Sequence, residues 1–231
     1  MSVNIAATPC LDCTFRSLIF DKLTKDELEL LDQSKEELSF KKGDTILAEG
    51  QQIREFVYLQ RGLVKLSKRT SDHKERIVSL AKTKSFIGFL TVFSQEEYQY
   101  SITALTDCSF CFIDIDAIRN IIRSNGDFAL DVLSKISKVS DDIICNRLNL
   151  STRQLRGRIA YILVLLSKDI FHNTIFHLPV TRREIGELIN VSTANVIRMF
   201  SEFRKDDIID IDDHTIKIKD FKSLEKISRI G

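Results

Sequence analysis

The side chains with the widest chemical potential in this 231-residue chain are its five cysteines. Cys10 and Cys13 form a C-x-x-C pair, Cys108 and Cys111 lie three residues apart, and Cys145 stands alone. The number is odd and the chain is too long for a small disulfide-stapled domain. We therefore expect these thiols to be free, metal-bound or redox-active rather than joined in structural disulfides.

Polar residues with a possible binding role gather in the stretch 180–205. Thr181 and Glu184 form a capping box, which predicts that a helix begins there. Asn190-Val191-Ser192 then predicts a tight turn, because Asn tolerates the left-handed conformation and Ser can cap a following helix. Two short helices around such a turn are typical of a helix-turn-helix, whose second helix enters the DNA major groove. An ordinary helical hairpin in a packed core is the alternative.

The second helix has a predicted inner face and a predicted outer face. The apolar positions expected inside are Val196, Met199 or Phe200, and Phe203. The positions expected outside are Thr193, Ala194, Asn195, Ile197 and Arg198. Residues 208–211 and 215–219 then predict two strands across a turn, so the segment resembles a winged helix. Residues 151–205 also carry nine Lys and Arg against four Asp and Glu, a local excess that favours DNA as the partner over the core-hairpin alternative.

Composition limits the other classes of function. With 43% hydrophobic and 29% charged residues, the chain is long enough for two modest soluble domains. No apolar run could span a membrane and the first twenty residues lack a secretion signal, so we expect a cytoplasmic protein without a membrane partner. A β-roll enzyme would need clustered histidines around a metal. Only His73 of the four histidines lies in the β-rich region, which argues against an enzyme.

The remaining elements must position these groups. Residues 1–20 form an arm, and residues 23–31 predict a short helix capped by Thr24 and Glu27. From Glu37 to Asp116, short β-type runs are punctuated by single glycines, which indicates an antiparallel barrel or roll. Residues 153–168 predict a further helix under the winged helix.

Residues 128–150 predict a long helix with two apolar sets. The first set is spaced in a heptad-like seam: Val132, Ile136, Val139, Ile143, Asn146 and Leu150. The second set is Leu133, Ile144 and Leu148. We expect the second set to pack within the chain, which leaves the first seam for the same helix of a second copy, with Asn146 pairing with its mate.

The fold expected is therefore α+β, with a roll and arm at 1–127, a dimerisation helix at 128–150 and a winged helix-turn-helix at 151–231. This order resembles the Crp/Fnr family of bacterial transcription regulators. The segments that carry the resemblance are FKKGDTILAEGQQIREFVYLQRGLVKL at 40–66, FIG at 86–88, GRIAYILVLLS at 157–167 and TRREIGELINVSTANVIRMF at 181–200. It implies a cyclic-nucleotide-binding-like roll, a homodimer that binds double-stranded DNA under the control of an effector, and RNA polymerase as a further partner.

The resemblance places the effector pocket at Gly88, Phe89, Tyr100 and Ser101. In cAMP-binding members, a glutamate follows the FIG and an arginine precedes the serine. Phe89 and Tyr100 stand at those positions, and neither aromatic ring can neutralise a cyclic phosphate. We therefore expect an effector other than cAMP.

The oxygen-sensing branch of the family suggests a cofactor. It holds an iron-sulfur cluster with three cysteines of the arm and one of the roll, and Cys10, Cys13 and Cys111 match three of these positions. Ile19 occupies the fourth. Cys108 is a poor substitute, because residues three apart on a strand point to opposite faces. An iron-sulfur cluster, haem and no cofactor all stay open, as does a simple packing role for the cysteines.

The resemblance also assigns roles in DNA recognition. Arg198 matches an arginine used for base and phosphate contact, whereas Thr193 and Ala194 replace an Arg-Glu pair that reads G and C. With Asn195 available for adenine, an A/T-leaning half-site is expected. Ser192, Arg182 and Arg183 are expected at phosphates. The alternative is an interaction module built on the roll that no longer binds DNA specifically.

Overall fold

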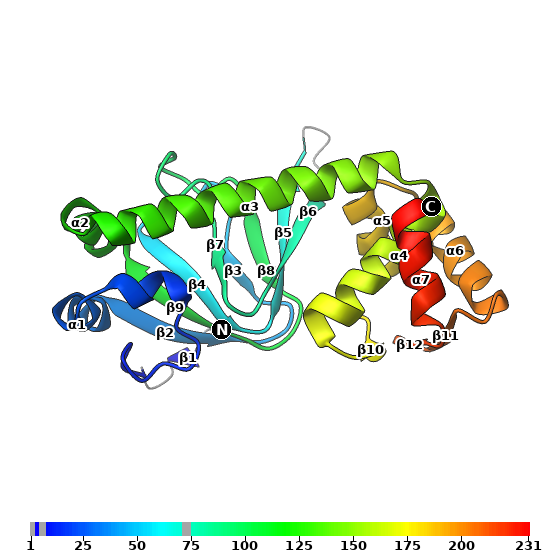
Figure 1. Ribbon diagram of the computed structural model, residues 1–231, viewed down its shortest axis with the longest axis horizontal. Helices are drawn as coiled ribbons and strands as arrows, with labels where there is room; N and C mark the ends of the chain where they lie inside the picture. The colour runs from blue at the N-terminus through cyan, green and yellow to red at the C-terminus, as the bar shows by residue number, and fades with distance from the viewer. Residues whose placement is uncertain (1–2, 5–7, 71–74) are drawn as a thin grey trace. The chain divides into compact units, whose positions relative to one another are not determined.

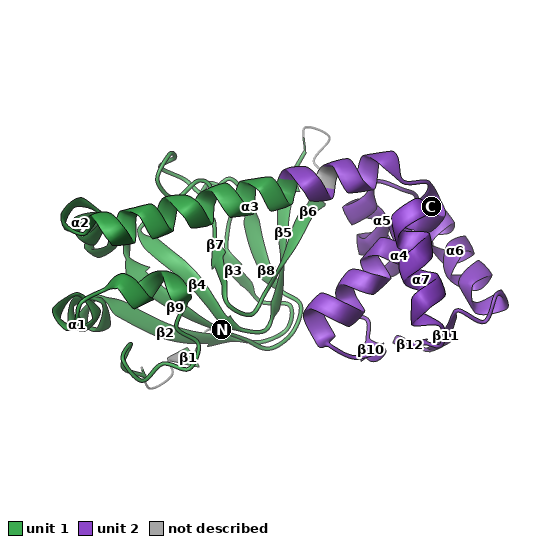
Figure 2. Ribbon diagram, viewed as in Figure 1, with its two compact units in different colours: residues 1–143 green, residues 144–231 purple. Residues whose placement is uncertain are grey.

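A computed structural model of the chain describes residues 3–4, 8–70 and 75–231. The chain forms two compact units, residues 1–143 and residues 144–231 (Figures 1 and 2). The boundary lies inside the long helix α3 (Gly126–Thr152), so α3 contributes to both units. The division at 127 and 150 therefore stays a prediction. His73 and part of the predicted arm lie outside the described residues.

Unit 1 is an antiparallel β-roll, as the glycine-punctuated pattern predicts. One sheet has the order β1-β2-β9-β4-β7 and the other has the order β3-β8-β5-β6. The strands are β1 (Val3–Asn4), β2 (Lys35–Phe40), β3 (Thr45–Leu47), β4 (Glu55–Arg61), β5 (Leu63–Arg69), β6 (Glu75–Lys82), β7 (Ser85–Ile87), β8 (Ser101–Ala104) and β9 (Cys108–Asp114). All the pairings between them are antiparallel.

The glycine turns have the backbone that glycine favours. Gly43, Gly50, Gly62 and Gly88 all have positive φ. Gly62, between β4 and β5, is also held close to its neighbours: a Cβ there would lie 2.5 Å from the Cys108 Sγ and 2.8 Å from the Asp107 carbonyl oxygen. No larger residue fits this turn without moving β9.

Unit 1 has an apolar core on each face of the larger sheet. The inner core lies within the roll and contains Leu59, Val64, Ile102 and Phe110. The outer core is covered by four helical segments: η1 (Leu18–Lys22), α1 (Lys25–Gln33), α2 (Ile115–Ser124) and the start of α3. The predicted capping box of Thr24 and Glu27 is present at the start of α1. The sequence interpretation missed α2, although Asp114 caps it.

Unit 2 is a winged helix-turn-helix. Its elements are α4 (Leu155–Val164), the π-helix η2 (Leu165–Phe171), β10 (Ile175–His177), α5 (Arg182–Ile189), α6 (Thr193–Lys205), β11 (Ile209–Asp212), β12 (Thr215–Ile218) and α7 (Phe221–Ile230). The inner face predicted for the helix at 153–168 is buried: Ile159, Ile162, Leu163 and Leu166. Among the described residues, no helix has the length and apolar character needed to cross a membrane.

Candidate nucleic-acid interface and sensor

The start of the helix-turn-helix is fixed by the predicted capping box. The Glu184 N–H donates to the Thr181 hydroxyl over 3.2 Å, and the Thr181 N–H donates to the Glu184 carboxylate over 2.8 Å. Two N–H groups at the N-terminus of α5 are thereby satisfied. Helix α5 ends at Asn190, which is left-handed with φ 57° and ψ 53°.

The turn between the helices depends on a close approach at Gly186. The Val191 N–H donates to the Gly186 carbonyl over 2.8 Å, and a Cβ on Gly186 would lie only 2.6 Å from the Val191 carbonyl oxygen. Ser192 then caps α6 by accepting a hydrogen bond from the Asn195 N–H over 3.3 Å. These contacts set the angle at which α6 leaves the turn.

Helix α6 has the two faces that its sequence predicts. Val196, Met199, Phe200 and Phe203 are buried against unit 2. Ser192, Thr193, Ala194, Ile197 and Arg198 are exposed, and Asn195 is half-buried. The outward face is therefore free to meet a partner, and it carries the basic side chain of Arg198.

The three candidate arginines differ in their surroundings. Arg182 donates to the Asp213 carbonyl over 3.4 Å, and its guanidinium lies 5.7 Å from the centre of the Phe200 ring. Arg183 pairs with Glu187 at 3.0 Å but stays largely exposed, whereas Arg198 lies 4.0 Å from Glu202 and is 62% exposed. Arg182 thus ties α5 to the wing, while Arg183 and Arg198 keep their charge at the surface.

The wing is completed by elements that the sequence interpretation missed. Strand β10 pairs with β12 and extends the predicted β11–β12 hairpin to three strands. Helix α7, capped by Asp220 through the Ser223 N–H, packs against α4. Its signal was the pairing of a capping Asp with an apolar period at Phe221 and Leu224.

The sequence interpretation also missed Arg156, which joins α4 to the end of α6. Its guanidinium lies 2.6 Å from the Asp206 carboxylate and 4.8 Å from the centre of the Phe203 ring. Position 156 carries no motif, so only the packing of the two helices reveals this contact.

The four residues proposed for the effector pocket do not share one environment. Gly88 has φ 66° and packs against the Tyr98 ring. Phe89 is 4% exposed and lies in the outer core, where it stacks on Phe86 at 5.0 Å. The Tyr100 ring lies under the Lys68 ammonium at 5.4 Å, and the Ser101 hydroxyl accepts from the Glu49 N–H over 3.0 Å. The Phe89 ring therefore belongs to the aromatic cluster of the outer core, and the effector pocket at these four residues stays a prediction.

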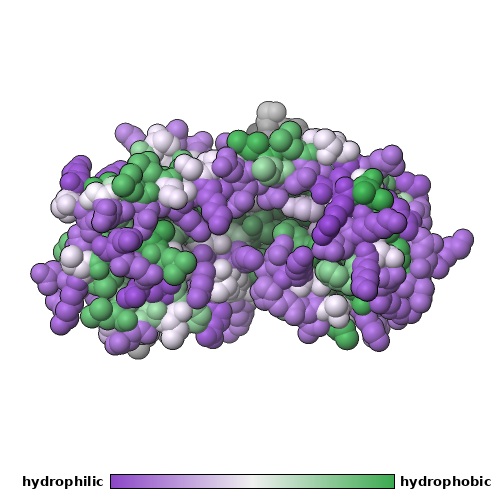
Figure 3. All heavy atoms as spheres, viewed as in Figure 1, coloured by the Kyte–Doolittle hydropathy of each residue, from purple (hydrophilic) through white to green (hydrophobic). Residues whose placement is uncertain are grey.

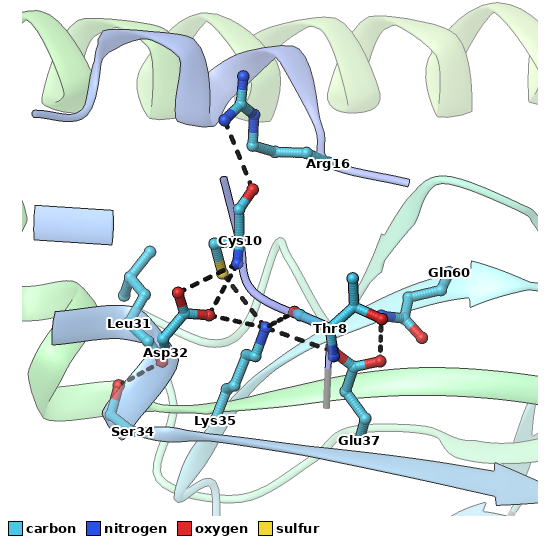
Figure 4. A network of polar contacts seen from close by, with 9 residues as sticks. All are labelled: Thr8, Cys10, Arg16, Leu31, Asp32, Ser34, Lys35, Glu37 and Gln60. Atoms are coloured by element: carbon cyan, nitrogen blue, oxygen red, sulfur yellow. Dashed lines mark hydrogen bonds and ion pairs between the residues drawn. The ribbon is translucent and has the colours of Figure 1, made fainter. Parts of the chain in front are cut away.

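Cys10 of the arm lies beside a buried lysine at the start of β2. The Lys35 ammonium, on a side chain only 2% exposed, pairs with Asp32 at 2.8 Å and Glu37 at 3.3 Å and lies 3.5 Å from the Cys10 Sγ (Figure 4). Burial, and secondarily Asp32, raises the pKa of Cys10 to about 11, while burial raises that of Cys111 to about 12. Both thiols are therefore protonated at neutral pH.

The geometry gives limited support for a metal site at Cys10, Cys13 and Cys111. Across the described part of the chain, no group of three or more His, Cys, Asp or Glu side chains is arranged to hold a metal ion. Cys108 and Cys111 do point to opposite faces, as expected: Cys108 lies in the inner core and Cys111 in the outer one. The ligand role of the three cysteines stays a prediction.

Three apolar side chains of the first predicted set of α3 meet the core, whereas those of the second set are exposed. Val132 is 3% exposed within the outer core, and Ile136 and Val139 pack against that core. Asn146 accepts a hydrogen bond from the Tyr161 hydroxyl of its own chain, and Leu150 is half-buried. The first three residues of the seam therefore contact the core of their own chain, and the dimerisation role assigned to the seam stays a prediction. The apolar side chains left at the surface are Leu130, Leu133, Ile143, Ile144 and Leu148, and hydrophobic residues gather over α3 in Figure 3.

Comparison with known proteins agrees with both units. Residues 37–125 match the family described as the cyclic nucleotide-binding domain, and residues 157–227 match the Crp-like helix-turn-helix domain. The chain is 23% identical to the anaerobic regulatory protein of Bacillus subtilis over 84% of this chain and 83% of that protein. It is 25% identical to the cAMP-activated global transcriptional regulator CRP of Salmonella typhimurium over 75% and 85% of the two chains.

Solved structures share the fold. FixK2 from Bradyrhizobium japonicum superposes with a TM-score of 0.74 at 17% identity, covering 84% of this chain and 98% of that one. The CRP-family regulator TTHB099 from Thermus thermophilus gives 0.71 at 18% identity, covering 82% and 95%. The two matched domains stand in the same order as the roll and the winged helix described above, and the relatives are transcriptional regulators rather than enzymes. The chain therefore belongs to the Crp/Fnr family of bacterial transcription regulators.

Proposed function

We propose that this regulator is a homodimer that binds a palindromic DNA site through α6 and responds to an effector other than cAMP. The observation that carries DNA binding is the capped, exposed face of α6, from Ser192 to Arg198, beside a three-stranded wing. Thr193, Ala194 and Asn195 supply a methyl, a methyl and an amide, which favour thymine and adenine edges. Ser192, Arg182 and Arg183 are proposed at phosphates, which would fix the register on the duplex.

The homodimer is proposed through the exposed apolar face of α3. Leu130, Leu133, Ile144 and Leu148 are 64%, 59%, 57% and 59% exposed, and their spacing puts them along one side of a helix. Four large apolar side chains along one side are unusual on a free surface and typical of an interface between helices. A second copy would bury the same face of its own α3, as a two-fold dimer requires. DNA with two half-sites about one helical turn apart suits such a dimer.

An effector without a cyclic phosphate is supported by the residues around Tyr100. The Lys68 ammonium lies over the Tyr100 ring and acts as a point charge rather than as a two-pronged donor. Phe89 offers no polar group. We propose RNA polymerase as a further partner and the cytoplasm as the site of action, since both follow from regulation of transcription.

Salt-dependent binding to duplex DNA tests the DNA-binding part of this proposal. Titration of a fluorescent duplex of random sequence at several salt concentrations should give an affinity that falls steeply and linearly on a double logarithmic plot. Arg183→Ala should reduce the steepness of the plot of log affinity against log salt concentration by about one unit, whereas Lys138→Ala on α3 should not change it. Absence of binding at low salt would instead favour an interaction module that has lost DNA binding.

A further inference from the structure

Lys35 docks the N-terminal arm onto the β-roll through backbone groups of the arm. Its ammonium donates to the Thr8 carbonyl, and the Glu37 carboxylate that it pairs with accepts from the Thr8 N–H over 3.1 Å (Figure 4). The Cys10 N–H donates to both Asp32 oxygens, at 2.8 and 3.1 Å. The arm is thus held at Thr8 and at Cys10 by charged hydrogen bonds that water does not screen well.

The network leaves little freedom for the residues that take part. Glu37 and Gln60 are 6% and 5% exposed, and the Gln60 amide donates to the second Glu37 oxygen over 3.0 Å. If the arm leaves, Lys35 and Glu37 lose their hydrogen bonds to Thr8 and Asp32 loses those to the Cys10 N–H, and water must replace them. Docking is therefore a defined state of the arm rather than a loose contact.

Cys10 sits at the centre of this contact, and its neighbour in the C-x-x-C pair does not. The Cys10 Sγ lies 3.5 Å from the Lys35 ammonium, and the Cys10 carbonyl accepts from Arg16 over 3.4 Å. Cys13 lines a cavity of about 500 Å³ that Thr8, Glu37 and Gln60 of the network also line, but among the described residues its thiol forms no hydrogen bond with Lys35. Both cysteines are free and half-buried.

We propose that Cys10 and Cys13 are a dithiol modification site, whose oxidation to an intrachain disulfide competes with docking of the arm on Lys35. A disulfide fixes the two sulfurs about 2 Å apart and the two Cβ atoms about 3.8 Å apart. Closing it consumes the Cys10 thiol that contacts Lys35 and constrains a residue whose N–H and carbonyl are held by Asp32 and Arg16. Docking therefore favours the dithiol, and oxidation favours a released arm.

The oxidant required is a small disulfide such as oxidised glutathione. The Cys13 thiolate attacks one glutathione sulfur and releases one glutathione; the Cys10 thiolate then attacks the Cys13 sulfur of the mixed disulfide and releases the second. Two thiol protons and two electrons leave the protein, and one glutathione disulfide becomes two glutathione thiols.

Release of the arm would reach the helix proposed for dimerisation. Phe20, in η1, stacks on Phe128 of α3 at 6.1 Å, and both rings lie in the outer core. The Phe15 carbonyl, between Cys13 and η1, accepts from the Tyr58 hydroxyl over 2.7 Å. The chain from Cys10 to Phe20 is thus a short path from the dithiol to the first turn of α3. The inference itself does not depend on DNA binding.

Trypsin makes the test simple, because the peptide 1–16 contains Cys10 and Cys13 and no other cysteine. Full-length protein is equilibrated in glutathione buffers, free thiols are alkylated, and the ratio of disulfide to dialkylated peptide is measured by mass spectrometry. In the buffer that half-oxidises the wild type, Lys35→Met and Asp32→Asn should each raise this ratio at least tenfold. Lys41→Met is the matched control, since its exposed ammonium pairs with Asp107 at the surface and should leave the ratio within twofold.

A second measurement follows the arm itself. Cleavage of the native protein by trypsin at Arg16 should be at least fivefold faster after oxidation, and Cys13→Ser should abolish that response. If Lys35→Met does not unfold cooperatively on heating, Asp32→Asn decides alone. A ratio within twofold of the wild type in the folded variants, or no disulfide in peptide 1–16 when only oxidised glutathione is present, would overturn the proposal.

Discussion

The proposed dimer face of α3 can be tested by placing charges on its exposed apolar residues. We expect the double variant Leu133→Glu with Ile144→Glu to be a folded monomer. Fully burying a Leu or Ile side chain is worth about 1.5–3 kcal/mol. Leu133 and Ile144 are 59% and 57% exposed in the single chain, so somewhat more than half of that remains to be gained. Two positions in two copies thus contribute roughly 4–7 kcal/mol, and losing them weakens dimerisation by a factor of about 10³–10⁵.

Sedimentation velocity at micromolar concentration measures this directly, with circular dichroism to show that the fold is kept. Lys138→Glu is the matched control, because it adds the same charge to an exposed position of α3 away from the apolar face. Ile136→Glu should behave differently and destabilise unit 1, because Ile136 packs against its core. A dimer that survives Leu133→Glu with Ile144→Glu, or a folded monomer from Ile136→Glu, would refute the reasoning.

Four further outcomes are expected. Arg198→Ala should reduce binding to the selected DNA site by about 1–3 kcal/mol and relax its sequence preference, whereas Arg182→Ala should weaken all sequences alike, as competition binding would measure. Phe128→Ala should lower the free energy of unfolding by about 3–5 kcal/mol in urea, because its side chain is fully buried. Gly186→Ala should lower the melting temperature and abolish DNA binding, since its Cβ would meet the Val191 carbonyl. Burial opposes ionisation of Asp32, but hydrogen bonds from Lys35 and Cys10 outweigh it and hold the pKa of Asp32 below its usual value. The stability that ionised Asp32 contributes is therefore present above about pH 4 and is lost as the pH falls through the lowered pKa. Asp32→Asn should remove this acid dependence of the free energy of unfolding, as urea titrations would measure.

Local patterns predicted the elements best where the backbone itself demands a residue type. The capping boxes at Thr24 and Thr181, the left-handed Asn190 and the glycine turns of the roll all have the predicted conformations. Each of these signals depends on two or three neighbouring residues and on no distant partner. The buried face of α6 was likewise readable from a 3.6-residue period.

Periodicity could not say which apolar face of α3 meets which partner. Val132 and Leu133 belong to sets with equally good helical spacing, and the choice depends on where the outer core lies. That core is assembled from the arm, α1, α2 and the larger sheet, so its position is a property of the whole unit. The position of Phe89 depends on the same core, because its ring packs with Phe56 and Phe86 on the outer face.

The buried lysine network was invisible in the sequence. Lys35 begins an ordinary polar strand, KEELSF, and nothing in that pattern predicts a side chain that is 2% exposed. Its burial arises because the N-terminal arm returns over β2 and contacts Lys35 at Thr8 and Cys10. Only the tertiary structure connects Cys10 with Asp32 and Glu37.

The central claim is that α6 of a dimer reads DNA, and selection of binding sites from a random duplex library by the full-length protein tests it most directly. We expect the protein to select an inverted repeat, with A/T-leaning half-sites about one helical turn apart. Enrichment of the G/C-containing half-site of the cAMP-responsive family members, or of no repeat at all, would contradict it.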